Sequence, residues 1–266
     1  DGDEVLTQPI SFIATANAIS YCKAIPHFVD VDKETLGLSP SILERYLDEI
    51  VEIIDGVSYN RLTKKRIAAC VPMHTYGFPC KIDEIRDICN AWSIPLVEDA
   101  AESLGSFYNS KHTGTFGDIG ILSFNGNKLI TTGGGGMIIT NDEEIAINAK
   151  HITTTSKIAH PYKFFHNEVG YNYRMPNLNA ALGCAQMEQL ESFLKIKRNV
   201  TKIWKNFFKD YSIDFINQID GANANNWLNV IVLENIEDRD LFLEFTNNNK
   251  VMTRPAWELM SELPAF

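Results

Sequence analysis

The sequence lacks several features that would narrow its class at once. It has no apolar run of about 18 residues, which a membrane-spanning helix needs, and no signal peptide at its start. No CxxC pair occurs, and the cysteines are few, odd in number and scattered. This pattern favours a reduced, cytoplasmic protein over one built on disulfides or a zinc site. The five cysteines are Cys22, Cys70, Cys80, Cys89 and Cys184.

Basic residues are also in deficit. The 24 lysines and arginines face 34 acidic residues, which gives a formal net charge of −10. Such a surface disfavours nucleic acid or an anionic membrane as the main partner. The 266 residues suffice for one large domain and part of a second. The chain begins Asp1-Gly2-Asp3 without a methionine, already close to a strand, and we expect both of its ends to continue in a longer protein.

Short apolar runs alternate with amphipathic segments through the first half of the chain. Ser39 and Pro40 are a typical N-cap and first residue of a helix, and a second helix is expected over 81–92. Continuous apolar strands separated by helices predict an α/β fold, with a mostly parallel central sheet and helices on both faces. The expected strands are 25–31, 67–73, 94–98, 119–124 and 136–140.

The second half predicts a different organisation. Helical periodicity runs without interruption from about 178 to 208, and a β-α-β unit is expected over 227–253. We therefore divide the chain into a large domain, 1–177, and a connecting long helix with a partial small α+β domain, 178–266. Residues 55–66 are polar and rich in turn formers, and we expect a surface excursion there.

Chemically interesting residues follow the expected strands, where ligands bind in open α/β sheets. Asp99 closes an apolar strand, and Lys128 stands five residues after Ser123, past the end of another. The run 133–136 consists of four glycines, but no Lys-Ser/Thr pair follows as a P-loop requires. Each feature alone has a plain explanation: a capping aspartate, a solvated lysine or a flexible turn.

In this order, however, the features resemble the DegT/DnrJ/EryC1/StrS family of sugar aminotransferases. That family belongs to the fold-type-I (aspartate aminotransferase-like) enzymes, which use pyridoxal 5'-phosphate (PLP). The resemblance covers nearly the whole chain, and phrases such as ACVPMHTYGFPCKIDEI look closest to the branch that makes UDP-linked 4-amino sugars. The matching stretches are QPISFIATANAI, IPHFVDVDKETL, VPMHTYGFPCKIDEI, LVEDAAESLGSFY, GDIGILSFNGNKLITTGGGGMIIT and GYNYRMPNLNAALG.

The resemblance implies roles for three residues. Lys128 would form the Schiff base with PLP and later move a proton between substrate and cofactor. Asp99 would face the pyridine nitrogen and keep it protonated, so that the ring can accept electrons. Ser123 would bind the cofactor phosphate through its hydroxyl. No metal is implied.

Further residues take candidate roles from the same resemblance. Phe12 matches an aromatic residue that lies over the cofactor ring, although a core phenylalanine fits the sequence equally well. Glu102 stands near the cofactor, where relatives often carry glutamine or histidine. His74 is a candidate for the substrate site, with a structural histidine as the alternative. Lys23 departs from the glycine that relatives usually carry before the second strand.

Three more residues imply contacts from elsewhere. Asn172 lies in a segment that, in relatives, reaches the neighbouring subunit's site and touches the phosphate, which implies a homodimer. Arg174 is expected to do similar work or to pair structurally. Arg254 is a candidate for binding the nucleotide sugar or the donor carboxylate.

The implied reaction moves an amino group from glutamate to C4 of a 4-keto-6-deoxy nucleotide sugar. Two alternatives stay open: a truncated, non-catalytic piece of such an enzyme, and a PLP sugar dehydratase. Dehydratase relatives carry histidine in place of the Schiff-base lysine, so the presence of Lys128 counts against the second.

Overall fold

The computed structural model describes residues 1–211 and 213–266. Its centre is a mixed sheet in which the strands run in the order β2-β1-β5-β6-β9-β10. Bridges at Cys70–Leu96 and Met73–Asp99 join β5 to β6, and only β10 runs antiparallel to its neighbour. The predicted α/β class is confirmed. The strands are β1 (Glu4–Thr7), β2 (Ile25–Phe28), β5 (Ile67–Val71), β6 (Val97–Asp99), β9 (Ile119–Ser123) and β10 (Gly136–Ile139).

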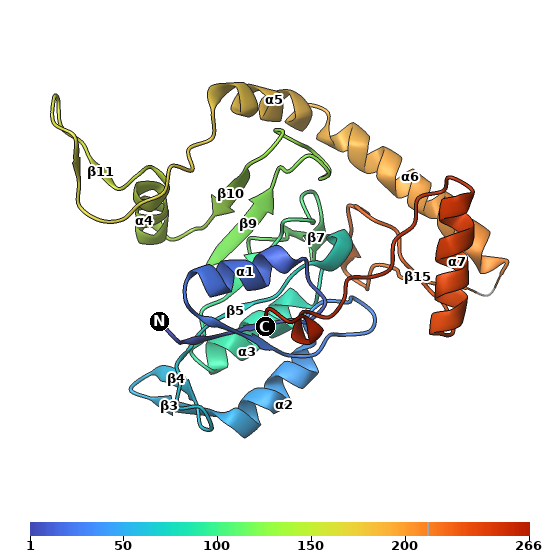
Figure 1. Ribbon diagram of the computed structural model, residues 1–266, viewed down its shortest axis with the longest axis horizontal. Helices are drawn as coiled ribbons and strands as arrows, with labels where there is room; N and C mark the ends of the chain where they lie inside the picture. The colour runs from blue at the N-terminus through green and yellow to red at the C-terminus, as the bar shows by residue number, and fades with distance from the viewer. Residues whose placement is uncertain (212) are drawn as a thin grey trace.

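Helices cover both faces of this sheet (Figure 1). Helix α1 (Ile13–Tyr21) lies on one face, while α2 (Pro40–Ile50) and α3 (Ile82–Ala91) lie together on the other. The α2–α3 side holds the main core, because the apolar stripes of both helices are buried against the strands. Its fully buried side chains include Leu6, Leu38, Leu43, Leu47, Cys70, Ile82 and Ile85.

Two predicted helices of the first half are confirmed. Ser39 caps α2 by accepting a hydrogen bond from the Ile42 amide at 3.4 Å, with Pro40 as the first helical residue. Helix α3 lies within the predicted range 81–92.

The excursion predicted for residues 55–66 contains regular structure in its first half that the prediction did not include. Strands β3 (Val51–Ile54) and β4 (Val57–Asn60) form an antiparallel hairpin there. Asp55 and Gly56 form its two-residue turn, with φ of 51° and 77°. An Asp-Gly pair between strands is a strong hairpin signal because both turn residues need positive φ.

The long helix predicted over 178–208 is two helices, α5 (Asn177–Met187) and α6 (Leu190–Lys209). The β-α-β unit predicted over 227–253 is also wrong in part. Helix α7 (Ile236–Asn248) is present, but only β15 (Ile231–Val232) precedes it, and residues 251–253 form no strand. Strand β15 pairs with β13 (Asp214–Phe215).

The chain beyond α6 returns to the first half of the molecule. Strand β14 (Ala222–Asn223) pairs with β7 (Phe107–Tyr108), which in turn pairs with β8 (Lys111–His112). Ala224 and Trp227 pack with Tyr76 and Phe78 in a second buried cluster. Short 3-10 helices lie at Thr75–Gly77 and Met260–Glu262.

Residues 154–176, which we call the arm, connect helix α4 (Glu143–Thr153) to α5. The arm contains a small hairpin of β11 (Lys157–Ile158) and β12 (Phe165–His166), and it projects from the body of the molecule (Figure 1). Across the described residues, no helix is both long and apolar enough to cross a bilayer.

Candidate active site

Asp99 and Ser123 lie at the same edge of the sheet. Asp99 is the last residue of β6 and Ser123 the last of β9, and the two strands are parallel, with Asp99 opposite Ile121. The carboxyl ends of parallel strands meet at one edge, so the carboxylate and the hydroxyl reach the same region. The Ser123 hydroxyl accepts a hydrogen bond from the Asn125 amide at 3.3 Å, at the start of the loop that carries Lys128.

The Asp99 carboxylate is oriented by two donors. Its Oδ2 accepts from the Thr15 hydroxyl of α1 at 2.6 Å, and its Oδ1 accepts from the Ala101 amide at 3.1 Å. An ionised carboxylate has about four acceptor positions, so Asp99 can still accept from another donor such as a protonated ring nitrogen. Helix α1 therefore holds the acid in place without using up its acceptor capacity.

Lys128 lies in the loop after β9, and its amine has two partners. Its Nζ is 3.2 Å from Glu102 Oε1 and 4.3 Å from the centre of the Trp227 ring. The Trp227 indole N–H donates to the Asn127 carbonyl at 2.8 Å, which ties that ring to the lysine loop. With its side chain only 11% exposed, the amine is fixed between a carboxylate and an aromatic face.

Glu102 is fully enclosed on the other side of this ion pair. Its Oε2 accepts from the Tyr76 amide at 2.9 Å. Burial raises the pKa of Glu102 to about 7, and the nearby Asp99 charge adds to the rise, whereas Lys128 and the Tyr76 amide lower it. The balance of these effects leaves the pKa of Glu102 near neutrality, next to the lysine amine.

His74 lies inside the protein, where it has no exposed surface. Its Nδ1 accepts from the Cys80 amide at 3.2 Å, so the ring hydrogen is on Nε2, which donates to Glu98 at 3.1 Å. Glu98 also accepts from the amides of Gly114 and Gly117, each at 2.7 Å. Burial opposes ionisation of Glu98, but these donors outweigh it and lower its pKa. This network is structural and does not bring His74 to the site edge.

The Phe12 side chain is half exposed, at the N-terminal end of α1. Its ring centre lies 6.1 Å from that of Trp257, which packs at 4.7 Å against Tyr76. Phe12 is thus not a core residue, and its half-exposed ring lies next to the aromatic pair of Trp257 and Tyr76.

Three other predicted residues are not brought to Lys128 within the described chain. Asn172 bridges to Thr154 in the arm, and Arg174 is an exposed arm residue. Arg254 donates to Asn247 of α7 at 3.2 Å and to a neighbouring carbonyl. Their predicted contacts with ligand remain predictions.

Sequence reasoning missed the residues that orient the chemical groups. Thr15 fixes Asp99, Trp227 covers Lys128 and Tyr76 binds Glu102 through its backbone. Tyr76 has a left-handed backbone, with φ of 56°, before Gly77 at 92°. The Tyr-Gly pair was a usable turn signal. No local pattern could have placed Trp227, which comes from the far end of the chain.

The donor set fits PLP better than a metal. Among the described residues, no group of three or more histidine, cysteine or acidic side chains is arranged to hold an ion. PLP instead offers a partner for each group of the site. Its aldehyde suits the enclosed lysine amine, its ring nitrogen suits the acid with free acceptor positions, its phosphate suits the strand-end hydroxyl, and its ring suits the half-exposed aromatic side chain.

Comparisons with known proteins agree with this geometry. The model of the DegT/DnrJ/EryC1/StrS aminotransferase family matches residues 1–266. EpsN of Bacillus subtilis (strain 168), assigned as a pyridoxal phosphate-dependent aminotransferase, is 37% identical over 268 residues, which are 100% of this chain and 66% of EpsN. GDP-perosamine synthase of Escherichia coli O157:H7 is 34% identical over 270 residues, covering 100% of this chain and 68% of the synthase.

The crystal structure of the aminotransferase TlmJ from Streptoalloteichus hindustanus superposes with a TM-score of 0.88 at 25% identity. The match covers 99% of this chain and 68% of TlmJ. The chain thus spans about two thirds of the length of these relatives.

Proposed function

This chain belongs to the DegT/DnrJ/EryC1/StrS family of PLP-dependent sugar aminotransferases, and we propose that it aminates C4 of a 4-keto-6-deoxy nucleotide sugar with glutamate as the donor. The reaction would have two halves: glutamate would be converted to 2-oxoglutarate, and the keto sugar would then be converted to the amine. The observation that carries the proposal is the enclosed Lys128 amine in the loop after β9, which pairs with Glu102, itself near the Asp99 charge.

When bound, PLP supplies an electron sink and a carrier for the amino group. Lys128 would hold the cofactor through its amine and, when free, would move a proton at the substrate carbon. Asp99, oriented by Thr15, holds the proton on the ring nitrogen. Ser123 would bind the phosphate, and Phe12 would pack against the ring.

For the sugar, we propose a UDP-linked N-acetylhexosamine, because of the resemblance of phrases such as ACVPMHTYGFPCKIDEI. A GDP-linked 4-keto sugar is a second candidate, which the identity with GDP-perosamine synthase supports. Turnover of a panel of UDP-, dTDP- and GDP-linked 4-keto sugars distinguishes the two. In either case, His74 is the least suited of the predicted substrate contacts, whereas Arg174 and Arg254 are exposed.

We further propose that the working enzyme is a cytoplasmic homodimer with shared sites, in which the arm carries Asn172 to the partner. The five free cysteines agree with a reducing compartment. We keep the division into a large domain, 1–177, and a connecting and small domain, 178–266. A dehydratase remains disfavoured, because the residue in the cofactor loop is Lys128.

The direct test is an absorbance titration with PLP. The unchanged chain is expected to develop a band from the cofactor bound to lysine, and Lys128→Ala is expected to lose both the band and the turnover of keto sugar with glutamate. Lys111→Ala is the matched control, because Lys111 also lies over an aromatic ring, that of Phe116 at 4.6 Å, outside the proposed site. An unchanged band in Lys128→Ala contradicts the proposal. If the unchanged chain develops no band, the alternative of a truncated, non-catalytic piece is supported instead.

A further inference from the structure

The Glu102–Lys128 ion pair differs from an ordinary surface pair. The Glu102 side chain is 1% exposed and that of Lys128 is 11% exposed, while their nearest atoms are 3.2 Å apart. Exposed ion pairs contribute little to stability because water screens their charges. In an enclosed pair, each charge strongly affects whether the other group is protonated. Burying a carboxylate there costs free energy unless neighbouring charges and hydrogen-bond donors compensate for the lost water.

The surrounding backbone is built to hold this carboxylate. Tyr76 keeps a strained left-handed conformation, and its amide donates to Glu102 Oε2. Gly77 allows the tight turn, since a Cβ there would lie 2.0 Å from Asn225 Oδ1 and 3.0 Å from the Glu102 carbonyl. Asn225 in turn donates to that carbonyl at 2.8 Å. Both the carboxylate and the backbone carbonyl of Glu102 are therefore held by hydrogen bonds.

The titratable groups around Glu102 come from separate elements. Lys128 lies in the loop after β9, Asp99 ends β6, and the Tyr76 phenol belongs to the 3-10 helix at 75–77. Farther out, Lys197 of α6 donates to the Trp227 carbonyl at 2.7 Å. Among these groups, Lys128 is the cation in contact with Glu102. A proton that moves between the two leaves the net charge of the site unchanged, so the pair titrates as a unit.

We propose that Glu102 is the counter-ion of the Lys128 nitrogen, both before cofactor binds and after that nitrogen has bonded to it. This inference rests on the proposed use of PLP. On capture, the Lys128 ammonium replaces the aldehyde oxygen of PLP: a carbon–nitrogen double bond forms and the carbon–oxygen bond breaks. Water leaves with two of the ammonium hydrogens, and the third stays on the nitrogen beside Glu102. No net proton is released, so a carboxylate here favours the protonated adduct.

The test follows the absorbance of the PLP-loaded protein as a function of pH. An opposite charge in contact shifts a protonation midpoint by roughly one to three pH units. The midpoint of the lysine-bound cofactor is therefore expected to fall by that amount in Glu102→Gln, which keeps the shape and loses the charge. Glu34→Gln is the control, because it removes an equal charge from an exposed pair with Lys81 and should leave the midpoint unchanged.

Each outcome decides the matter. Equal midpoints in the unchanged chain and Glu102→Gln overturn the counter-ion role and leave the aminotransferase proposal intact. Absence of any lysine-dependent band in the unchanged chain overturns both. If Glu102→Gln fails to load PLP, Glu102→Asp restores a carboxylate: loading regained in that variant supports the role, and loading lost in both overturns it. Borohydride reduction followed by mass analysis of the Lys128 peptide measures loading without reference to turnover.

Discussion

Lys23 adopts a left-handed backbone, with φ of 58°, in the turn between α1 and β2. Its amide donates to the Ser20 carbonyl at 2.8 Å, so the turn is closed, and its side chain extends to Asp1 on the surface. A residue with a Cβ costs of order 1 kcal/mol in this conformation, and glycine avoids that cost. The departure from the family's glycine is thus accommodated by local strain, without a change in the turn.

Lys23→Gly is therefore expected to stabilise the chain by roughly 1 kcal/mol, because the strain disappears and only a surface ion pair is lost. Urea unfolding followed by circular dichroism measures the change. Lys33→Gly, at an exposed lysine outside the left-handed region, is the control and should not stabilise. A loss of stability in Lys23→Gly would show that the Asp1 contact outweighs the strain.

Between elements, Glu98 of β6 holds the loop before β9 against the sheet. It accepts from the Gly114, Phe116 and Gly117 amides and from His74 without any exposure to water. Glu98→Gln turns one acceptor into a donor that faces amide hydrogens, and the loss is expected to be about 3 kcal/mol or more. Since β6 ends in Asp99, cofactor binding should weaken as well.

The pH dependence of this loss has a defined sign. The folded protein lowers the pKa of Glu98 below its ordinary 4.5, so its contribution is complete above pH 4.5 and disappears as the pH falls through the folded pKa. Unfolding titrations should therefore show the two chains converging in acid. Glu52→Gln, in an exposed pair with Lys64, should cost less than about 1 kcal/mol at any pH, and an equal loss in both variants would rule out the special role of Glu98.

The elements differ in how far the sequence predicts them. Strands β5, β6, β9 and β10 and helices α2 and α3 follow from apolar patterns and caps, because burial imposes those patterns locally. The break between α5 and α6 does not, because neither glycine nor proline marks it. There the Gln189 amide bonds to the Gln186 carbonyl, one residue closer than in an α-helix. The change of direction lets α5 contact the Thr132 carbonyl through Asn179 while α6 buries Leu194, and such long-range contacts leave no local signal.

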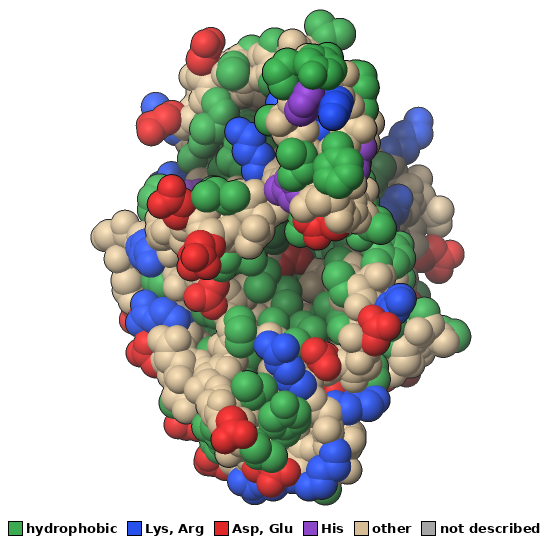
Figure 2. Space-filling model, turned by 90° about the vertical axis from the view of Figure 1, so that its left-hand side faces the viewer, with side chains coloured by type: hydrophobic (Ala, Val, Ile, Leu, Met, Phe, Trp, Pro, Cys, Tyr) green, Lys and Arg blue, Asp and Glu red, His purple; other side chains and the backbone are tan. Residues whose placement is uncertain are grey.

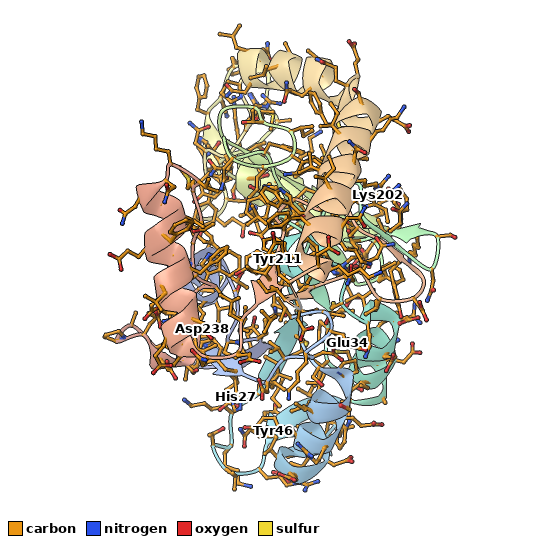
Figure 3. All side chains as sticks on the ribbon, turned by 90° about the vertical axis from the view of Figure 1, so that its right-hand side faces the viewer. His27, Glu34, Tyr46, Lys202, Tyr211 and Asp238 are labelled. Atoms are coloured by element: carbon orange, nitrogen blue, oxygen red, sulfur yellow. The ribbon has the colours of Figure 1, made fainter. Side chains whose placement is uncertain are left out.

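The same limit applies to the candidate site. Lys128, Asp99 and Ser123 are identifiable because their order along the chain resembles the family's pattern, with Asp99 and Ser123 at strand ends and Lys128 in the loop that follows. Their partners Thr15 and Trp227 lie 84 and 99 residues away from Asp99 and Lys128 along the chain, and only the folded protein brings them together. A second polar cluster shows the same effect at β2: His27 bonds to Tyr46 of α2 at 2.6 Å and to Glu4 at 3.2 Å, and Figure 3 shows His27 and Tyr46 near each other.

At the scale of the whole molecule, the arm exposes many large apolar side chains to solvent, which is unusual for a protein that acts as a monomer. Figure 2 shows hydrophobic side chains gathered on the face that carries the arm, around a hollow in the middle of the molecule. Surfaces of this kind are typical of interfaces between proteins, and a second copy agrees with the proposed shared site. The arm's large exposed apolar side chains are Ile158, Tyr162, Phe164, Phe165, Val169, Tyr171 and Tyr173.

Mixed dimers test whether Asn172 serves the partner's site. Lys128→Ala and Asn172→Ala are each expected to be inactive or strongly impaired alone, because every site in the pure variants lacks one of the two residues. In a mixed dimer, the lysine of one subunit meets the asparagine of the other, so one of its two sites is complete. Random mixing makes half of the dimers mixed, and about a quarter of the original activity should return. Unmixed proteins at the same total concentration are the control, and the oligomeric state is checked by sedimentation. If Asn172 acts within its own subunit, the mixed dimers contain no complete site and no activity returns, while a fully active monomer would exclude shared sites altogether.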